Sequence, residues 1–358
     1  MTLAARQPAT ARRVRAMLVD DSAIIRGFMR RWIEQDGRIE LVKVCADGAQ
    51  AVAEAPACKP DVIILDIEMP NMDGLTALPK LRKLAPDARI VMASTLTSAG
   101  AVQAVKALAL GAADYIAKPQ TSQIGGVDSY RVELLDKIVA LGERAGGASR
   151  SRADYRLKPR PIITRKPAAM VVAASTGGPA ALPAFLGPIC RRIDQPVLIV
   201  QHMPAAFTPL LAEKLEQAIG KPCREAVDGE AIGAGSVLLA PGDQHMRIAK
   251  APAGAIVQLD RGPPVNSCRP AADPLFDTAA MAFGGRVLGV VLTGMGHDGR
   301  SGAGAIVSAG GRVIVQDEVS SVVWGMPGSV AQAGHAEAVL PLADLGQTAL
   351  RIMNGEAA

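Results

Sequence analysis

Residues 16–145 alternate short apolar runs with amphipathic stretches, a pattern typical of strands that are each followed by a helix. Repeated strand–helix units place their strands in parallel, so the pattern predicts a (βα)5 sheet covered by helices on both faces. The predicted strands are Ala16–Asp20, Leu41–Ala46, Val62–Asp66, Arg89–Ser94 and Asp114–Ile116. The predicted helices lie near 23–35, 48–55, 75–84, 98–110 and 128–143.

A second α/β pattern begins at residue 168 and continues to about 350. Between the two patterns, residues 144–167 are rich in Gly, Ser, Pro and basic side chains, which is typical of a linker. We therefore expect a tail at 1–15, a first domain at 16–143, a doubly wound and mainly parallel α/β domain at 168–350, and a tail at 351–358. The later strands are expected at Ala169–Ala174, Pro196–Gln201, Ser236–Ala240, Ala255–Leu259, Val287–Thr293 and Arg312–Gln316, and the helices near 179–187, 207–219 and 301–309.

Composition agrees with two packed α/β domains. The chain has 358 residues, of which 49% are hydrophobic and only 3% aromatic, with 36 Gly and 25 Pro. The net charge is +5, but the basic excess lies in the N-terminal tail and the linker. A nucleic-acid-binding protein usually carries its basic patch on a folded face, so no nucleic-acid partner is predicted.

The cysteines and the apolar runs exclude further classes of protein. The five cysteines have no CxxC spacing, which predicts free thiols in a reducing compartment rather than a disulfide framework or a zinc site. No apolar run reaches the roughly 18 residues that a membrane span requires. We therefore expect a cytoplasmic protein that does not insert into a membrane.

Carboxylates follow two strands of the first domain: Asp20 and Asp21 the first strand, and Asp66 the third. The carboxyl ends of parallel strands meet at one edge of a sheet, and grouped carboxylates suit Mg²⁺. Ser94 ends the fourth strand and Lys118 follows the fifth, and both would suit an anion placed on Asp66. The pattern predicts a phosphoryl-acceptor site; the alternative is that each Asp only caps a helix.

The segment Asp61–Gly74 (DVIILDIEMPNMDG) resembles the region around the phosphorylated aspartate of response-regulator receiver domains. The resemblance implies that Asp66 is the phospho-acceptor and that Asp20, Asp21 and Asp66 bind Mg²⁺. It also implies switch roles for Ser94, Tyr115 and Lys118, and a cis peptide bond before Pro119.

Three motifs in the second domain suggest nucleophilic catalysis. Ser175 lies in the turn AASTGGP after a strand, His202 follows the next strand in QHMP, and Asp298 ends LTGMGHD. A serine, a histidine base and an orienting aspartate form a triad if the fold brings them together. The alternatives are a phosphate-binding Gly turn, a packed structural histidine, a common Asp-Gly turn, and His245 as the base.

Together these motifs resemble the catalytic domain of the CheB family of chemotaxis protein-glutamate methylesterases. The resemblance implies catalytic roles for Ser175, His202 and Asp298. It also implies that the backbone N–H groups of Thr176 and Met295 form an oxyanion hole. Ala173, Ala271 and Ala272 depart from the usual motifs.

The two resemblances together imply a two-component response regulator that is a phosphorylation-activated hydrolase. Its substrates would be glutamate methyl esters on methyl-accepting chemoreceptors, with receptor glutamines as a second target. A chemotaxis histidine kinase would supply the phosphoryl group, Mg²⁺ would serve the receiver, and the esterase would need no cofactor. The alternative is a catalytically silent receptor-binding module gated by phosphorylation.

Overall fold

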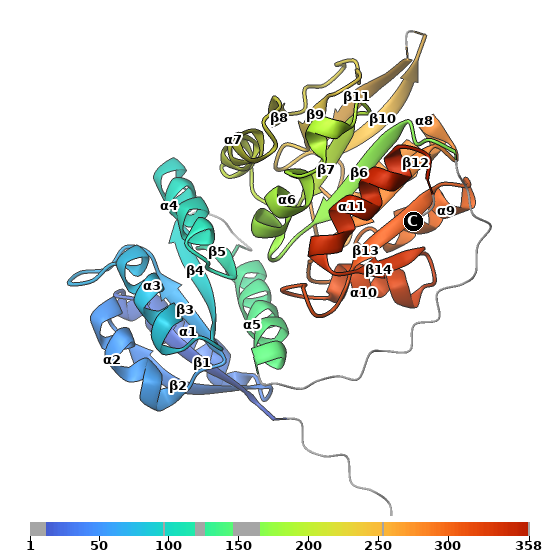
Figure 1. Cartoon of the computed structure of the whole chain (residues 1–358). Coiled ribbons are helices and arrows are strands. Elements are labelled where there is room, and N and C mark those ends of the chain that lie inside the picture. Colours follow the sequence, from blue (N-terminus) through green and yellow to red (C-terminus); the bar gives the residue numbers. More distant parts are fainter. Residues whose placement is uncertain (1–11, 96, 119–125, 146–164, 253, 357–358) are drawn as a thin grey trace, which may run out of the picture. The chain divides into compact units, whose positions relative to one another are not determined.

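The computed structural model describes residues 12–95, 97–118, 126–145, 165–252 and 254–356 (Figure 1). The chain divides into two compact units, and the two large sheets are built from separate halves of the sequence. The predicted α/β class is confirmed. Pro119 and most of the predicted linker lie outside the described residues. No helix in the described ranges is both long and apolar enough to cross a membrane.

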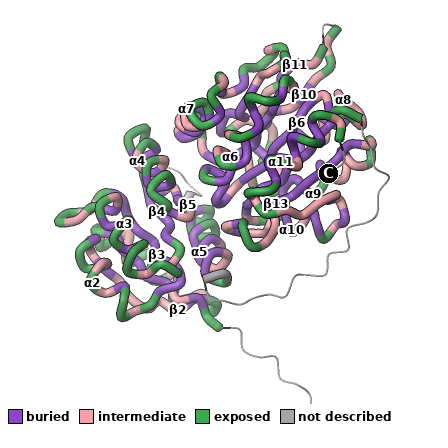
Figure 2. Tube along the Cα trace, in the orientation of Figure 1, coloured by how far each residue is buried: buried purple, intermediate pink, exposed green. Residues whose placement is uncertain are grey.

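The first sheet has five strands in the order β2-β1-β3-β4-β5, the arrangement expected of a (βα)5 domain. The pairs β1/β2, β1/β3 and β3/β4 run parallel. Helix α1 packs on α5 and α2 packs on α3, and the strands between them are largely buried (Figure 2). The strands are Val14–Val19, Ile39–Cys45, Val62–Asp66, Arg89–Thr95 and Asp114–Lys118, and α1 to α5 span Ala23–Gln35, Gly48–Cys58, Gly74–Leu84, Ser98–Ala109 and Gly126–Ala145.

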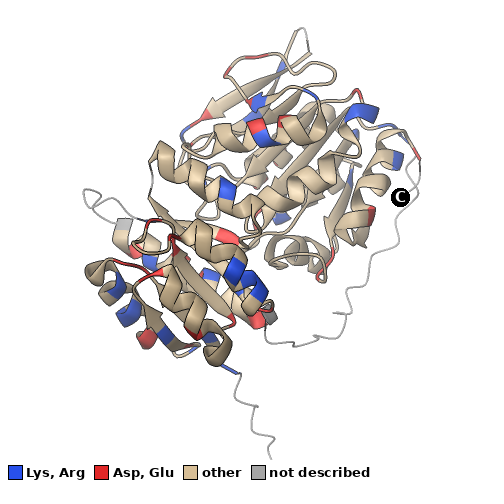
Figure 3. Ribbon diagram, turned by 60° about the vertical axis from the view of Figure 1, so that its left-hand side comes forward, with Lys and Arg blue, Asp and Glu red and all other residues tan. Residues whose placement is uncertain are grey.

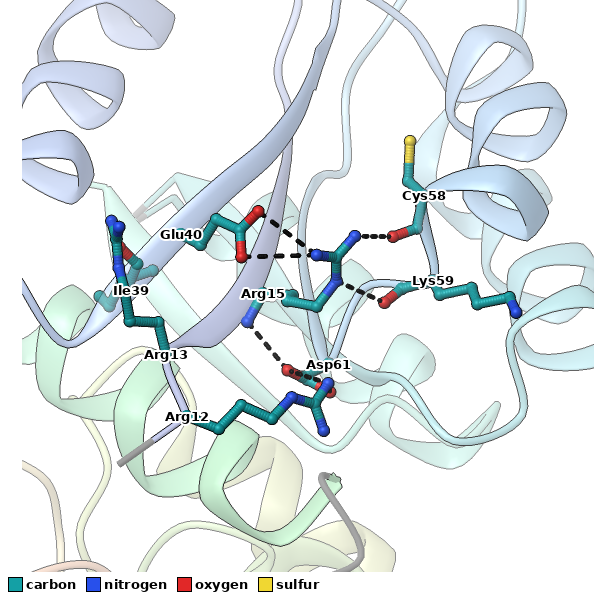
Figure 4. A network of polar contacts seen from close by, with 8 residues as sticks. All are labelled: Arg12, Arg13, Arg15, Ile39, Glu40, Cys58, Lys59 and Asp61. Atoms are coloured by element: carbon teal, nitrogen blue, oxygen red, sulfur yellow. Dashed lines mark hydrogen bonds and ion pairs between the residues drawn. The ribbon is translucent and has the colours of Figure 1, made fainter. Parts of the chain in front are cut away.

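Strand β1 begins at Val14, two residues before the predicted start, because Arg15 is held in the sheet (Figure 4). The Arg15 guanidinium donates from Nη2 to the carbonyl of Cys58 (2.8 Å) and from Nε to that of Lys59 (3.3 Å). These carbonyls lie at the C-terminal end of α2, where a cation compensates the helix dipole. Arg15 therefore belongs to the fold rather than to a tail.

Asp61, just before β3, makes further polar contacts with the start of β1. Its carboxylate accepts hydrogen bonds from the backbone N–H of Arg15 (2.9 Å) and from Nη2 of Arg12 (3.0 Å). Arg12 and Arg15 are thus paired at the amino end of the sheet (Figure 4). Asp20 and Asp66 lie at the opposite, carboxyl ends of β1 and β3.

The second sheet has seven strands in the order β14-β13-β12-β6-β7-β9-β8, all of them parallel to their neighbours. Residues Ala255–Leu259, predicted as a strand, belong instead to a separate antiparallel hairpin of β10 and β11. The strands β6 to β14 are Ala169–Ala174, Val197–Gln201, Cys223–Glu225, Val237–Leu239, His245–Ala251, Gly254–Asp260, Val287–Val291, Arg312–Gln316 and Ala338–Leu340.

Helices cover this sheet in two groups. Helix α6 packs on α7 and α11, whereas α9 packs on α8 and α10. The strands between them carry almost no charged residues, as the tan strands of Figure 3 show. Helices α6 to α11 span Gly178–Leu186, Thr208–Ile219, Ala272–Phe283, Arg300–Ser308, Gly325–Gln332 and Leu342–Met353.

Strand β6 lies at the point where the strand order reverses. From β6 the chain first builds outward through β7, and later returns to add β12 on the other side. In open parallel sheets, ligands bind at the carboxyl ends of the strands that flank such a reversal. The topology therefore predicts a ligand site at the carboxyl ends of β12, β6 and β7.

Candidate active site and phosphorylation site

Ser175 lies directly after β6, in the turn that opens α6. Its backbone N–H donates to the carbonyl of Thr293 (3.0 Å), and its carbonyl accepts from the N–H of Gly178 (2.7 Å). Gly177 has a φ of 82°, a conformation that suits glycine in so tight a turn. The turn holds Ser175 at the sheet edge, next to the N-terminus of α6.

His202 occupies the matching position at the end of β7. Ala174 and Gln201 are partners in the parallel register, and the N–H of His202 donates to the carbonyl of Ala174 (3.1 Å). The amide Nε2 of Gln201 also donates to the carbonyl of Ser175 (2.9 Å). The ends of β6 and β7 therefore bring Ser175 and His202 side by side, as the sequence predicts.

Asp298 follows β12 and completes the group. Its Oδ2 lies 2.7 Å from Nε2 of His202 and accepts the backbone N–H of Ala272 (2.5 Å) at the start of α8. Its Oδ1 accepts the N–H of Asp273 (3.2 Å). Because Ala272 contributes a backbone group, the departure from the family motif at that position removes no hydrogen bond to Asp298.

The electrostatics of the Asp298–His202 pair favour an ionised carboxylate beside a basic imidazole. Burial raises the pKa of Asp298, but the hydrogen bond and charge of His202, together with the hydrogen bonds from Ala272 and Asn266, bring it below its ordinary value. Burial lowers the pKa of His202, but Asp298 and then Cys268 raise it well above its ordinary value. The carboxylate thus strengthens the imidazole as a proton acceptor.

The second ring nitrogen of His202 has an unexpected neighbour. Nδ1 lies 3.3 Å from Sγ of Cys268. Among the described residues, the Ser175 hydroxyl makes no hydrogen bond to His202. Because Nε2 of His202 contacts Asp298, a hydrogen bond between Ser175 and the imidazole would have to use Nδ1.

His245, the alternative base, is completely buried. Its Nε2 contacts the carbonyl of Pro263 (3.1 Å), and its Nδ1 accepts the N–H of Ala271 (3.2 Å). Both ring nitrogens are thus used by backbone groups, which is the arrangement of a structural histidine. This geometry favours His202 over His245 as the base.

The segment around Met295 lies against Ser175. A Cβ built on Gly294 would approach Cβ of Ser175 to 2.9 Å and Sδ of Met326 to 2.3 Å, so only glycine fits there. Within the described ranges, the N–H groups of Thr176 and Met295 donate to no protein acceptor. Both are therefore available to a negatively charged oxygen beside Ser175.

In the first sheet, Asp20, Asp21 and Asp66 come together at one edge. One oxygen of each lies within 4.8 Å of the others, and an all-carboxylate set suits Mg²⁺. The capping alternative does not explain this cluster, because α1, α2 and α3 are capped by Ser22, Asp47 and Asp73.

Lys118 joins the carboxylate cluster. Its Nζ lies 2.8 Å from Oδ2 of Asp20 and 2.7 Å from Oδ2 of Asp66. Burial raises the pKa of Asp66 to about 6, against the lowering effect of Lys118. Ser94 is buried at the end of β4, and the ammonium of Lys137 lies 5.4 Å from the ring centroid of Tyr115.

Family comparisons agree with both halves of the structure. Residues 16–124 match the model of the response regulator receiver domain, and residues 170–349 match that of the CheB methylesterase. The chain belongs to the CheB methylesterase family.

Relatives in this family match the chain along most of its length. A protein-glutamate methylesterase/protein-glutamine glutaminase of Caulobacter vibrioides is 50% identical over 93% of this chain and 97% of its own. One from Azospirillum brasilense is 47% identical over 93% of this chain and 91% of its own. The crystal structure of the Thermotoga maritima CheB methylesterase catalytic domain superposes with a TM-score of 0.51 at 36% identity, covering 52% of this chain and all of that one.

Two residues beside the CheB-like triad were not predicted: Asn266, which contacts Asp298, and Cys268. Both lie in a loop between β11 and α8 for which the sequence predicts no element. The only available signals were the polar Asn-Ser pair, typical of a turn, and a cysteine outside the apolar runs.

Proposed function

We propose that the chain is a phosphorylation-activated protein-glutamate methylesterase in which Ser175 is the nucleophile, His202 the base and Asp298 the residue that orients it. The observation that carries this proposal is the 2.7 Å contact of Asp298 with His202, at the end of the strand next to Ser175. The full-length relatives named above support the same activity.

In the acylation step, Oγ of Ser175 attacks the carbonyl carbon of the methyl ester and passes its proton to Nδ1 of His202. The carbonyl oxygen becomes negative and accepts hydrogen bonds from the N–H groups of Thr176 and Met295. The C–O bond to the methoxy group then breaks. His202 returns the proton to the leaving oxygen, and methanol departs from an acyl-Ser175 ester.

In the deacylation step, His202 takes a proton from water, which attacks the acyl carbon. The bond between that carbon and Oγ of Ser175 then breaks, His202 returns the proton to Oγ, and the glutamate side chain is released. A glutamine side chain would follow the same route with ammonia as the leaving group. The names of the relatives include glutaminase, which supports deamidation as a second activity.

We further propose that Asp66 is the phospho-acceptor and that Asp20, Asp21 and Asp66 bind Mg²⁺. Mg²⁺ bound there neutralises the carboxylates and the incoming phosphoryl oxygens. Lys118, already in contact with Asp66, would pair with the phosphoryl group. Ser94 and Tyr115 would change position when Asp66 is phosphorylated and so alter the surface of the unit.

The proposed partners are chemoreceptors as substrates and a chemotaxis histidine kinase as phosphoryl donor, in the cytoplasm. A silent receptor-binding module is less well supported. Ala173, the departure that favours it, is buried inside β6 rather than exposed at the site.

The decisive experiment measures methanol release from a methylated receptor fragment. The wild-type protein, phosphorylated with a small phosphodonor, should release methanol, and Ser175→Ala should not. Ser301→Ala, at an exposed serine of α9, is a matched control that should retain activity. An unchanged rate in Ser175→Ala would show that the esterase assignment is wrong.

A further inference from the structure

A tight turn at residues 265–268 lies beside the triad; we call it the 265–268 turn. Val265 and Cys268 exchange two backbone hydrogen bonds, of 3.0 and 2.9 Å. The residues between them, Asn266 and Ser267, have positive φ angles of 51° and 63°. Two consecutive residues at positive φ are typical of a type I′ hairpin, in which Asn is favoured and Ser is not.

Asn266 binds the carboxylate of Asp298. Its Nδ2 donates to Oδ1 of Asp298 (2.9 Å) and to Oδ2 of Asp273 (2.9 Å), and an amide nitrogen carries a hydrogen for each. Asp298 thereby receives four hydrogen bonds, two on each oxygen: His202 and the Ala272 N–H on Oδ2, and Asn266 and the Asp273 N–H on Oδ1. Such a carboxylate has a fixed orientation.

Cys268 contacts His202, the other member of the Asp298–His202 pair. When neutral His202 donates from Nε2 to Asp298, Nδ1 is an acceptor, and the thiol 3.3 Å away is the group that can donate to it. The imidazole is thus held at both nitrogens. Because a thiol is a weak donor, Nδ1 can exchange this partner for the Ser175 hydroxyl at small cost.

We propose that the 265–268 turn is a clamp for the Asp298–His202 pair, with Asn266 and Cys268 as positioning residues of the esterase. Asn266 fixes the carboxylate, and Cys268 holds the imidazole with Nδ1 directed away from Asp298 until substrate binds. This inference rests on the proposed function, because it assigns the clamp to the same catalytic histidine.

Asn266 and Ser267, the two central residues of the turn, allow a pair of matched substitutions. Glycine suits the positive φ of both central residues, so Asn266→Gly and Ser267→Gly preserve the backbone, while only the first removes the contact with Asp298. Asn266→Gly should lower kcat about tenfold or more, as expected for the loss of a hydrogen bond to a charged group, and leave KM nearly unchanged. Ser267→Gly should keep the wild-type kcat.

Cys268 is tested with Cys268→Ala and Cys268→Ser. The alanine variant should lower kcat several-fold and shift the pKa of His202, because it removes the side chain that contacts Nδ1. The serine variant keeps a donor and should restore part of both effects. The pKa of His202 is measured by NMR titration of the imidazole in the full chain, which does not require activity.

The outcomes separate this inference from the proposed function. If Asn266→Gly and Cys268→Ala keep the wild-type kcat and the His202 titration does not move in Cys268→Ala, the clamp is wrong. If the wild-type protein releases no methanol, the proposed function fails. The titration of His202 in wild type and Cys268→Ala then still decides whether the thiol holds the imidazole.

Discussion

Nε2 of His202 lies 2.7 Å from Oδ2 of Asp298, although 96 positions separate the two residues in the sequence. The contact assigns Nε2 to the carboxylate and leaves Nδ1 for the proposed proton transfer. It also fixes how the esterase should respond to changes in charge and pH.

Replacing Asp298 with Asn should reduce kcat by about 10⁴-fold, by analogy with the same change in other serine triads. The proposed mechanism requires the base form of His202, whose pKa is raised, so the wild-type rate should rise with pH to values above the ordinary histidine pKa. Without the carboxylate the pKa of His202 falls, and the rising limb should move to lower pH. The pH profile of kcat/KM measures both effects, with Asp344→Asn at an exposed site on α11 as control. A limb that does not move would contradict the assigned contact.

His202→Ala and His245→Ala should fail in different ways. We expect His202→Ala to lose at least ~10³-fold in kcat with nearly unchanged stability, because its role arises in proton transfer. His245→Ala should keep most of its turnover but lose stability, since it leaves the buried N–H of Ala271 unpaired at a cost of about 1–3 kcal/mol. Methanol release and urea denaturation distinguish them, and the reverse pattern would make His245 the base.

Phosphorylation should depend on Asp66 and on a divalent cation. Incubation with a labelled small phosphodonor should modify the wild-type protein in Mg²⁺ and not in excess chelator, because three carboxylates cannot otherwise receive a further anion. Asp66→Asn should abolish the label, whereas Asp87→Asn, at an exposed position after α3, should not. Label that persists in Asp66→Asn would identify a different acceptor.

Alkylation of Cys268 should inactivate the esterase. A carbamidomethyl group on Sγ would occupy the space next to Nδ1 of His202, 3.3 Å away, and exclude the Ser175 hydroxyl. Iodoacetamide should therefore stop methanol release by the wild-type protein, and the residual activity of Cys268→Ala should resist it. Cys58→Ser, which removes the other partly exposed thiol, should remain as sensitive as wild type.

The sequence was most informative where a polar motif follows a long apolar strand. Ser175, His202 and Asp298 each follow such a strand, and parallel pairing brings the strand ends together. The same reasoning placed Asp20 and Asp66 at one edge, because β1 and β3 are neighbours.

What the sequence did not reveal depends on contacts that only the folded chain makes. Helix α8 was missed because its first turn, ADPL, contains a proline that is typical of a helix start but also of a loop. Strands β8 and β14 have three residues each and too little pattern to recognise. Asn266 and Cys268 lie 32 and 66 positions from their partners, so no local pattern could relate them.

Arg12 and Arg15, at the start of β1, have a practical consequence for anyone who expresses the receiver by itself. The family match begins at residue 16, but a fragment cut there would lose the guanidinium that covers the last carbonyls of α2 and both donors to Asp61. It would leave the mostly buried Asp61 carboxylate without those partners and would shorten β1, which lies between β2 and β3, by its first two residues. A fragment that begins at or before Arg12 keeps these contacts, whereas one that begins at residue 16 should be less stable.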